Sequence, residues 1–278
     1  MKNKRILITG MGGSLGSELC RQLAPNNQIF GIDINETAAY DLREELRQKG
    51  HWVHSRTGDI RNTETVFDVF SDFKPEVVIH CAAVKHVTPN NEYPEEAFST
   101  NIQGTYNLVR EAKRWECLEK FVFISTDKVV NAKCIMGITK LCAESFVRLQ
   151  GQRFVAVRFG NVMKSRGSVL EIWERQIEKG EPLTITDWNC ERYMMSIPEA
   201  CSLVLEAAEK GDNGELFILD MGERKTLKQL YDDFLTGKDF NPEVKLIGLR
   251  PGEALKEELM TEEEWRNSIK KDNFYILQ

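Results

Sequence analysis

Short apolar runs alternate with amphipathic segments along the first part of the chain. The runs cover residues 5–9, 28–32, 52–56, 76–80, 121–124 and 154–159. They are the length of strands and contain few polar positions, as is typical of strands buried on both faces of a parallel sheet. The segments between them have helical spacing. Strands that alternate with helices predict an α/β fold with a Rossmann-type doubly wound parallel sheet.

The pattern becomes less regular after Gly160. Helices are predicted over residues 168–179, 196–210 and 226–235, strands over 183–186, 216–219 and 244–247, and a helix at the charged C-terminal end. We therefore predict two domains. Residues 1–160 form the Rossmann domain, and residues 161–278 form mainly a smaller C-terminal α/β lobe, with some segments that return to the Rossmann core.

A glycine-rich turn follows the first predicted strand. Gly10, Gly13 and Gly16 form the pattern G-x-x-G-x-x-G, and Ser14 and Leu15 open the helix that follows. Glycines permit a sharp turn and close backbone approach to a pyrophosphate, which the free N–H groups of a helix N-terminus attract. Such a turn can also exist without a ligand, but its position between a strand and a helix favours a dinucleotide site. No second fingerprint follows, so we expect the C-terminal lobe to bind the substrate.

Asp33 ends the second predicted strand, about 20 residues after the glycines, where an acid accepts hydrogen bonds from the adenosine ribose. Because a carboxylate repels a 2′-phosphate, we expect NAD rather than NADP; the alternative is a turn aspartate without a ligand. Asp59, followed by Ile60, ends the third strand region. It could reach the adenine amino group or cap the helix after Asn62, and both roles are compatible.

The fourth strand leads into small residues and then into a basic pair. Ala82 and Ala83 would allow a flat ring to lie close, and Lys85 and His86 follow them. We assign Lys85 to the cofactor and substrate sites and His86 to the substrate site, against the alternative of an inert surface pair. Asn101 is polar among apolar neighbours, so it is expected to be hydrogen-bonded inside the protein, next to the cofactor.

The stretch STDKVVNAKCIMGITK, residues 125–140, follows the fifth predicted strand. Ser125, Thr126, Asp127 and Lys128 lie at the carboxyl end of that strand, where ligands of open α/β sheets bind. A carboxylate beside an amine suits acid–base chemistry. Lys140 then opens a predicted helix.

Met136 stands four residues before Lys140, on the same helical face. Many nicotinamide enzymes of the short-chain dehydrogenase/reductase type carry Tyr-x-x-x-Lys at this place. A thioether cannot donate or accept a proton in catalysis. Any mechanism must therefore work without that tyrosine.

Composition excludes several function classes. The net charge of −6 argues against a nucleic-acid-binding face. Seven cysteines without a C-x-x-C pair indicate free thiols in a reducing compartment and no metal site. No apolar run approaches the ~18–20 residues of a membrane span, and the first strand leaves no room for a signal peptide. We expect a cytoplasmic enzyme.

Several segments together resemble one family. They are ITGMGGSLGSEL, HCAAVKHV, NIQGTYNLV, STDKVVNA, MGITKLCAE, VRFGNVMKSRGSV, ERYMMSIPEA, LDMGE and GLRPGEALKEEL. The chain resembles the extended short-chain dehydrogenases/reductases and, more narrowly, the UDP-N-acetylglucosamine 4,6-dehydratases of bacterial surface-glycan and nonulosonic-acid pathways.

The resemblance implies a reaction with internally recycled NAD. Oxidation at C-4 of the sugar acidifies C-5, a base removes the C-5 proton, an acid protonates the departing C-6 hydroxyl, and hydride returns to C-6. By family position Lys128 is the base and Asp127 the acid, Thr126 bonds the C-4 oxygen, and Lys140 holds the nicotinamide ribose. A lysine base needs a lowered pKa and an aspartic acid a raised one, and because the two titrate as a pair neither role is fixed.

Met136 bears on the stereochemistry within this family. Tyrosine occupies this position in members that invert C-5, whereas methionine occurs in relatives, often longer and membrane-anchored, that retain it. The resemblance therefore favours the retaining reaction, with inversion as the alternative.

The resemblance also supplies nucleotide-binding positions. They are Asn161, Ser168, Val169, Arg192 and Arg250, with Glu253 as a further substrate-site residue. Arginine suits paired phosphate oxygens, although each arginine could instead form a surface ion pair. Glu253 either fixes Arg250 or caps a helix.

Other functions are compatible with the same fold. An epimerase or simple dehydrogenase would need a tyrosine where Met136 stands, and a non-catalytic NAD-binding protein would leave the Asp127–Lys128 pair unexplained. Fold alone does not decide among them. The family also predicts a homo-oligomer, with a UDP-sugar as substrate and no nucleic-acid or membrane partner.

Overall fold

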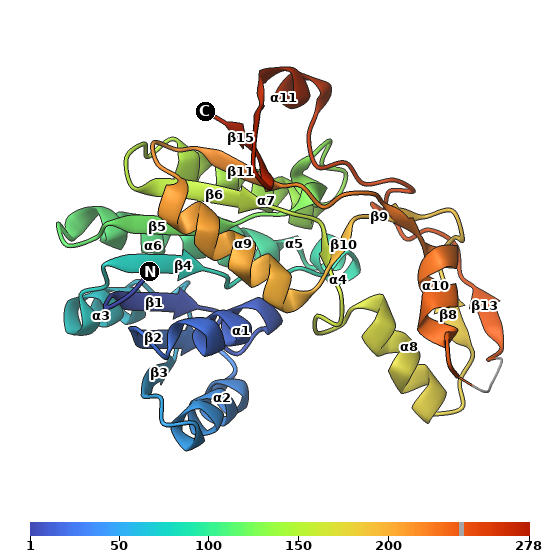
Figure 1. Ribbon diagram of the computed structural model, residues 1–278, viewed down its shortest axis with the longest axis horizontal. Helices are drawn as coiled ribbons and strands as arrows, with labels where there is room; N and C mark the ends of the chain where they lie inside the picture. The colour runs from blue at the N-terminus through green and yellow to red at the C-terminus, as the bar shows by residue number, and fades with distance from the viewer. Residues whose placement is uncertain (239–241) are drawn as a thin grey trace.

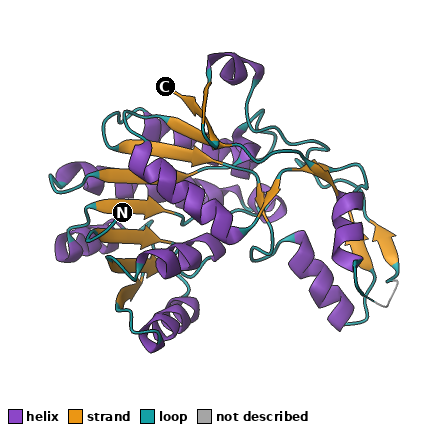
Figure 2. Cartoon of the chain, viewed as in Figure 1, coloured by secondary structure: helices purple, strands orange, loops and turns teal. Residues whose placement is uncertain are grey.

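The computed structural model describes residues 1–238 and 242–278 (Figure 1). Figure 2 shows helices in front of and behind a central sheet, and a smaller group of helices and strands to its right. The doubly wound α/β fold predicted from the sequence is confirmed.

The large sheet consists of nine strands. They are β1 (Arg5–Thr9), β2 (Gln28–Asp33), β3 (Val53–Thr57), β4 (Val77–His80), β5 (Lys120–Ile124), β6 (Phe154–Arg158), β11 (Leu216–Leu219), β14 (Ile269–Lys271) and β15 (Phe274–Leu277). Their order is β14-β15-β11-β6-β5-β4-β1-β2-β3. The seven strands from β11 to β3 in this order are parallel to one another. The hairpin of β14 and β15 extends the sheet, with β15 pairing antiparallel to β11. The chain order reverses between β1 and β4, which places a ligand crevice at their carboxyl ends.

Helices cover both faces of the sheet. They are α1 (Ser14–Leu23), α2 (Glu36–Gln48), α3 (Thr63–Phe73), α4 (Val87–Glu92), α5 (Pro94–Ala97), α6 (Thr105–Arg114), α7 (Ile135–Arg148), α9 (Ile197–Lys210) and α11 (Glu262–Asn267). Helices α1 and α9 pack together on one face, and α3, α6 and α7 pack on the other (Figure 1). Every residue of β4, β6 and β11 is buried, which explains the continuous apolar runs in the sequence.

The smaller lobe has a hydrophobic cluster of its own. Its elements are α8 (Val169–Glu178), α10 (Leu227–Leu235), the parallel pair β8 (Leu183–Ile185) and β13 (Val244–Leu246), and the antiparallel pair β9 (Glu191–Arg192) and β12 (Lys225–Thr226). Trp173 is fully buried there, and its indole N–H donates to the Thr184 carbonyl at 3.0 Å. The short pair β7 (Asn161–Val162) and β10 (Met194–Met195) lies between this lobe and the sheet (Figure 1).

Two local predictions need correction. The C-terminal end is not helical throughout, because only α11 is a helix and the last residues form the β14–β15 hairpin. Helix α7 begins at Ile135 rather than at Lys140, with Cys134 as its N-cap. A π-helix, η1 (Phe98–Gly104), precedes α6 and runs on into it.

Candidate active site

A cavity of about 1020 Å³ lies between the carboxyl ends of the parallel strands and the smaller lobe. It is larger than most sites for one small ligand. The predicted site residues that line it are Gly10, Gly13, Ser14, Leu15, Gly16, Ala83, Lys85, His86, Ser125, Thr126, Asp127, Lys128, Met136, Lys140, Asn161, Ser168, Val169, Arg192, Arg250 and Glu253. Asp33, Asp59, Ile60, Ala82 and Asn101 are not among the lining residues.

The glycine turn is shaped by close backbone contacts. Gly10 has φ +69°, and a Cβ on it would lie 2.8 Å from the Ala82 nitrogen. A Cβ on Gly16 would lie 2.1 Å from the Gly10 carbonyl oxygen. Gly13 caps α1 without a side-chain bond, so the helix N-terminus keeps donors available toward the cavity.

Asp33 lies beside this turn at the end of β2. Its carboxylate accepts from the Gly12 N–H at 2.8 Å and from the Asn35 N–H at 2.8 Å. Two backbone bonds fix its orientation next to the glycine turn. This is the position from which an acid reaches an adenosine ribose.

Asp59 and Ile60 are placed differently from the prediction. The Asp59 carboxylate accepts from the backbone N–H of Arg61 at 2.8 Å and from its guanidinium at 2.7 Å. Helix α3 is capped by Asn62, which accepts from the Thr65 N–H at 2.9 Å, so the alternative of Asp59 as the cap is wrong. Ile60 is buried beneath Gly104 and belongs to the core.

Asn101 is hydrogen-bonded inside the protein, as its apolar surroundings predicted. Its amide accepts from the Val84 N–H at 3.0 Å and donates to the Val84 carbonyl at 3.2 Å and to the Thr139 hydroxyl at 3.1 Å. These contacts occupy both ends of the amide. Asn101 therefore shapes the loop after β4, and it is not among the residues that line the cavity.

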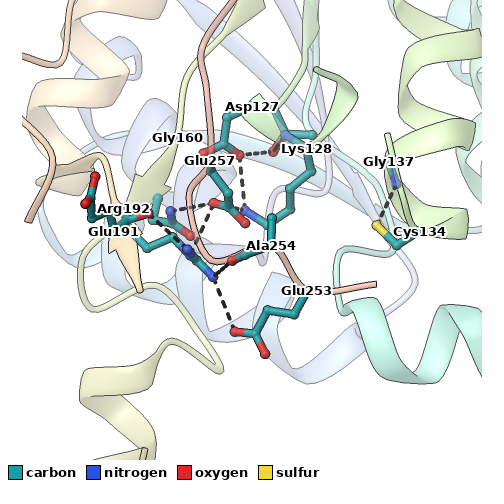
Figure 3. Close-up of polar contacts among 12 residues, drawn as sticks. Asp127, Lys128, Cys134, Gly137, Gly160, Glu191, Arg192, Glu253, Ala254 and Glu257 are labelled. Atoms are coloured by element: carbon teal, nitrogen blue, oxygen red, sulfur yellow. Dashed lines mark hydrogen bonds and ion pairs between the residues drawn. The ribbon is translucent and has the colours of Figure 1, made fainter. Parts of the chain in front are cut away.

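A compact polar cluster lies at the end of β5. Lys128 Nζ is 3.1 Å from Asp127 Oδ1 and 2.9 Å from Glu257 Oε2, and the Thr126 hydroxyl donates to Asp127 Oδ1 at 3.0 Å. Figure 3 shows Lys128 between the two acids, with Glu257 on the side of Arg192. Glu257 is buried and also accepts from the Asn161 amide at 3.2 Å. The cluster thus joins one ammonium to two carboxylates.

The environment shifts the pKa values of this cluster. Burial raises the pKa of Asp127 to about 6, although the Lys128 charge opposes the shift. Burial lowers the pKa of Lys128, but the charges of Asp127 and Glu257 outweigh it and hold that pKa above its usual range. Burial also acts to raise the pKa of Glu257, and Lys128 and Arg192 outweigh it and lower the pKa. Without ligand Lys128 is therefore charged, contrary to the neutral lysine that its expected role requires.

Lys140 and Met136 lie on α7, facing the cavity. The Lys140 ammonium donates to the Ile124 carbonyl and lies 3.9 Å from the centroid of the Phe123 ring. Burial lowers its pKa to about 7. Met136 is 3% exposed, so its thioether fills space at the cavity wall without offering an acid–base group.

Arg192 is engaged by the protein itself, and its guanidinium is buried. One terminal nitrogen donates to the carbonyls of Glu191 and Leu255 at 2.9 and 3.0 Å, and the other to the Ala254 carbonyl at 2.8 Å and the Glu253 carboxylate at 3.3 Å. Its Nε lies 3.4 Å from Glu257 Oε2. The two terminal nitrogens thus make four hydrogen bonds to protein acceptors, and Nε forms an ion pair with a buried carboxylate. The expectation that Arg192 binds phosphate is therefore not supported by this geometry: it fixes the segment from Glu253 to Glu257.

Arg250 differs from Arg192 because its side chain is exposed at the cavity. Glu253 accepts from the Arg250 backbone N–H at 3.2 Å and pairs with the Arg192 guanidinium, so it fixes the turn rather than the Arg250 side chain. Lys85 donates to the Ser165 hydroxyl at 3.5 Å, and His86 packs against Gly167. Arg250, Lys85 and His86 all line the cavity.

Four buried polar atoms of the described residues lack a hydrogen-bond partner and belong to cavity-lining side chains. They are Asn90 Nδ2, the Ser125 hydroxyl, Asp127 Oδ2 and the Ser168 hydroxyl. Buried polar groups are rarely left unpaired, so these atoms mark places where a ligand can bond.

Sequence reasoning missed Glu257. It lies within the segment GLRPGEALKEEL, between Lys256 and Glu258, where a run of charged residues suggests a solvated loop. No periodicity distinguishes the buried acid from its neighbours. The only available signal was that Glu257 lies in the segment GLRPGEALKEEL, which carries the family resemblance. That segment had pointed only to Arg250 and Glu253 as site residues.

Comparisons with known proteins agree with this architecture. A family model described as "Polysaccharide biosynthesis protein" matches residues 6–278. The chain belongs to this family. It is 42% identical over 95% of its length to the capsular polysaccharide biosynthesis protein CapD of Staphylococcus aureus, and 40% identical over 95% to the probable polysaccharide biosynthesis protein EpsC of Bacillus subtilis. It spans 46% of the length of each, so about half of these relatives.

Other relatives match over most of their own length. The chain is 31% identical to a UDP-glucose 4-epimerase of Rickettsia bellii, covering 98% of this chain and 82% of that protein. Among solved structures, Pen from Bacillus thuringiensis superposes with a TM-score of 0.92 at 33% identity, covering 99% of this chain and 88% of Pen. UDP-glucose 4-epimerase of Thermus thermophilus, at 24% identity and a TM-score of 0.76 over 91% of this chain and 89% of its own, shares the fold. Among residues 1–238 and 242–278, no helix has the length and apolar character needed to cross a membrane.

Proposed function

We propose that this protein is a nucleotide-sugar 4,6-dehydratase that converts UDP-N-acetylglucosamine to a UDP-4-keto-6-deoxy-N-acetylhexosamine for polysaccharide synthesis. The observation that carries the proposal is the Asp127–Lys128 pair. Asp127 is buried with a pKa of about 6 and lies 3.1 Å from the Lys128 ammonium, at the carboxyl end of β5. A dehydration needs an acid and a base side by side, whereas an epimerase does not eliminate water.

The residues present fit NAD as the cofactor. The backbone at Gly10 and Gly16 leaves no space for a Cβ, the N-terminus of α1 carries free donors, and Asp33 is fixed beside both. Lys140 would hold the nicotinamide ribose. Solved proteins of the same fold include the Thermus thermophilus epimerase complex with NAD and the Bordetella bronchiseptica enzyme WbmG with NAD and UDP.

The chain's own residues supply the proton chemistry. NAD, when bound, accepts a hydride from C-4 and returns it to C-6. Thr126 bonds the C-4 oxygen and passes its proton to Asp127, to which it already donates at 3.0 Å. Lys128 exchanges the C-5 proton, and protonated Asp127 gives its proton to the departing C-6 hydroxyl, which leaves as water. Met136 takes no part in these transfers, which agrees with the retaining outcome.

Arg250, Asn161, Ser168 and Val169 are proposed to contact the UDP part of the substrate. Arg250 has an exposed guanidinium at the cavity, and the Ser168 hydroxyl is buried without a partner. Charge-assisted bonds to phosphate are stronger than neutral ones, so Arg250 should dominate binding.

A UDP-sugar 4-epimerase is the second candidate, because Rickettsia epimerases match over 82% of their length. Incubation of purified protein with UDP-N-acetylglucosamine, followed by mass spectrometry, separates the two. The dehydratase gives a product lighter by one water, an epimerase gives no mass change, and a non-catalytic NAD-binding protein leaves the sugar unaltered. NMR of the product at C-5 distinguishes retention from inversion. A product of unchanged mass would reject the dehydratase.

A further inference from the structure

Glu257 is the buried acid of the site to which the reaction described above gives no role. One oxygen, Oε2, contacts three groups: Lys128 Nζ at 2.9 Å, Asn161 Nδ2 at 3.2 Å and Arg192 Nε at 3.4 Å. Figure 3 shows this carboxylate between Lys128 and Arg192. A buried acid is normally present because something requires its charge.

The protons of the proposed reaction show what requires that charge. Two protons leave the sugar before water departs, one from the C-4 hydroxyl and one from C-5. Asp127, bonded to Thr126, can accept the first. Lys128 can accept the second only if it has first given up a proton of its own, because it is charged in the free protein. The remaining acceptor in contact with Lys128 is Glu257.

We infer that Glu257 is a positioning residue that holds Lys128 over the sugar and takes up the lysine's proton while Lys128 acts as the C-5 base. This inference rests on the proposed dehydration.

The proton account closes over one cycle. The C-4 hydroxyl proton moves to Asp127, and a Lys128 proton moves to Glu257. The Lys128 amine removes the C-5 proton, the C-5–H electron pair forms the C-5=C-6 bond, and the C-6–O bond breaks as Asp127 protonates the oxygen. Lys128 then returns its proton to C-5 as the 4-keto product forms, and Glu257 gives its proton back to Lys128.

The geometry also couples the two carboxylates through Lys128. Both acids raise the pKa of the lysine against the effect of burial, through their charges and their hydrogen bonds. When Asp127 takes the C-4 proton and becomes neutral, the contribution of its charge is lost. The Lys128 pKa then falls toward that of Glu257, so transfer of the proton to Glu257 costs less free energy at the moment when a base is needed. Lys128 also lies close enough to Lys85 for its charge to lower the pKa of Lys85, and repulsion between two like charges acts on both of them.

Arg192 maintains this arrangement. Its bonds to the carbonyls of Ala254 and Leu255 hold the backbone just before Glu257, and its Nε faces the carboxylate. This explains why its donors are used within the protein rather than directed toward the substrate.

The first test is single-turnover kinetics on Glu257→Gln, which keeps the shape and the hydrogen bonds but removes the proton acceptor. The matched control is Glu258→Gln, because Glu258 pairs with Arg224 instead of Lys128. For Glu257→Gln we expect C-4 oxidation, seen as absorbance of the reduced cofactor, to stay within about threefold. Elimination and entry of solvent deuterium at C-5 should fall by about 100-fold, the lower end of the range of general acid–base catalysis. Equal slowing of oxidation and elimination, or no slowing, would overturn the inference.

The second test does not depend on activity. Lys128 is labelled in the unliganded protein with an amine-reactive acylating reagent, and the rate is followed by mass spectrometry at pH 8. In Glu257→Gln the lysine loses one of two anionic partners, so its free-amine fraction and labelling rate should rise by at least about tenfold, the effect of one pKa unit. An unchanged rate would refute the contact between Glu257 and Lys128. Suppose that Lys128 is labelled faster in Glu257→Gln, as expected, but the unaltered protein releases no water from the sugar. The proposed function then fails while the contact between Glu257 and Lys128 stands.

Discussion

Lys128 and Glu257 are separated by 129 positions in the sequence, yet Lys128 Nζ lies 2.9 Å from Glu257 Oε2. Lys128 follows β5 of the large sheet, whereas Glu257 belongs to the segment that returns from the smaller lobe before α11. Both side chains line the cavity. Together with Asp127, Glu257 raises the pKa of the lysine on which the proposed chemistry depends.

Replacement of Lys128 by Met should stop elimination, since the base at C-5 is lost. Solvent deuterium should no longer enter C-5, while cofactor should stay bound because Lys140 is unaltered. Met136→Leu is the matched change on the same cavity wall. It conserves volume and should keep most of the activity. Mass spectrometry of the product formed in deuterium oxide measures both the loss of water and the entry of deuterium at C-5. A Met136→Leu variant as inactive as Lys128→Met would give the methionine a role that is absent from this mechanism.

Asp127 should make stability depend on pH in a defined direction. Its folded pKa of about 6 lies above the ordinary value, so between about pH 4 and 6 the folded protein binds more protons than the unfolded one. The contribution of this group is fully present below about pH 4 and is lost as pH rises through 6. The Asp127→Asn variant has no titrating carboxyl at this position and does not lose this stability as pH rises. The difference between the melting temperature of the variant and that of the unaltered protein should therefore shift in favour of the variant from pH 4 to pH 7. A difference that is constant with pH would show that the carboxyl is not perturbed.

Arg192 and Arg250 should respond differently to substitution. Arg250→Ala should raise KM for the UDP-sugar by about tenfold or more, as expected for loss of a charge-assisted bond worth ~1.5–3 kcal/mol, with kcat little changed. Arg192→Lys cannot satisfy five acceptors and should lower kcat and the melting temperature, with a smaller effect on KM. Steady-state kinetics and thermal unfolding measure these quantities. Were Arg192→Lys to raise KM alone, Arg192 would be a phosphate ligand after all.

Asp33 should determine the choice of dinucleotide. Its carboxylate is fixed by the N–H groups of Gly12 and Asn35, beside the glycine turn, and would repel a 2′-phosphate. The unaltered protein should therefore bind NAD more tightly than NADP. Asp33→Ser should weaken NAD binding and reduce the difference in affinity between NAD and NADP, as measured by calorimetric titration. Tighter binding of NADP by the unaltered protein would contradict this account.

The sequence by itself determined the Rossmann sheet and the location of the site. Strands buried on both faces must be apolar throughout, and parallel strands need helical crossovers, so β1 to β6 could be read directly. The glycines at 10, 13 and 16 and the polar run from Ser125 to Lys128 follow predicted strands, and strand ends meet at one edge. These features depend on local sequence, which is why they were predictable.

Tertiary structure decided the state and the partners of the side chains. Whether Arg192 faces a phosphate or five protein acceptors depends on the path of the segment from Glu253 to Glu257, which local sequence does not specify. The Asn101 amide bonds Val84, and the last residues pair as β14 and β15 because β11 presents a free edge. The base role that the resemblance implies for Lys128 requires a lowered pKa. Asp127 and Glu257 hold that pKa high instead, and Glu257 is brought to the lysine from the far end of the chain, because electrostatic interactions depend on distance in space and not on separation in sequence.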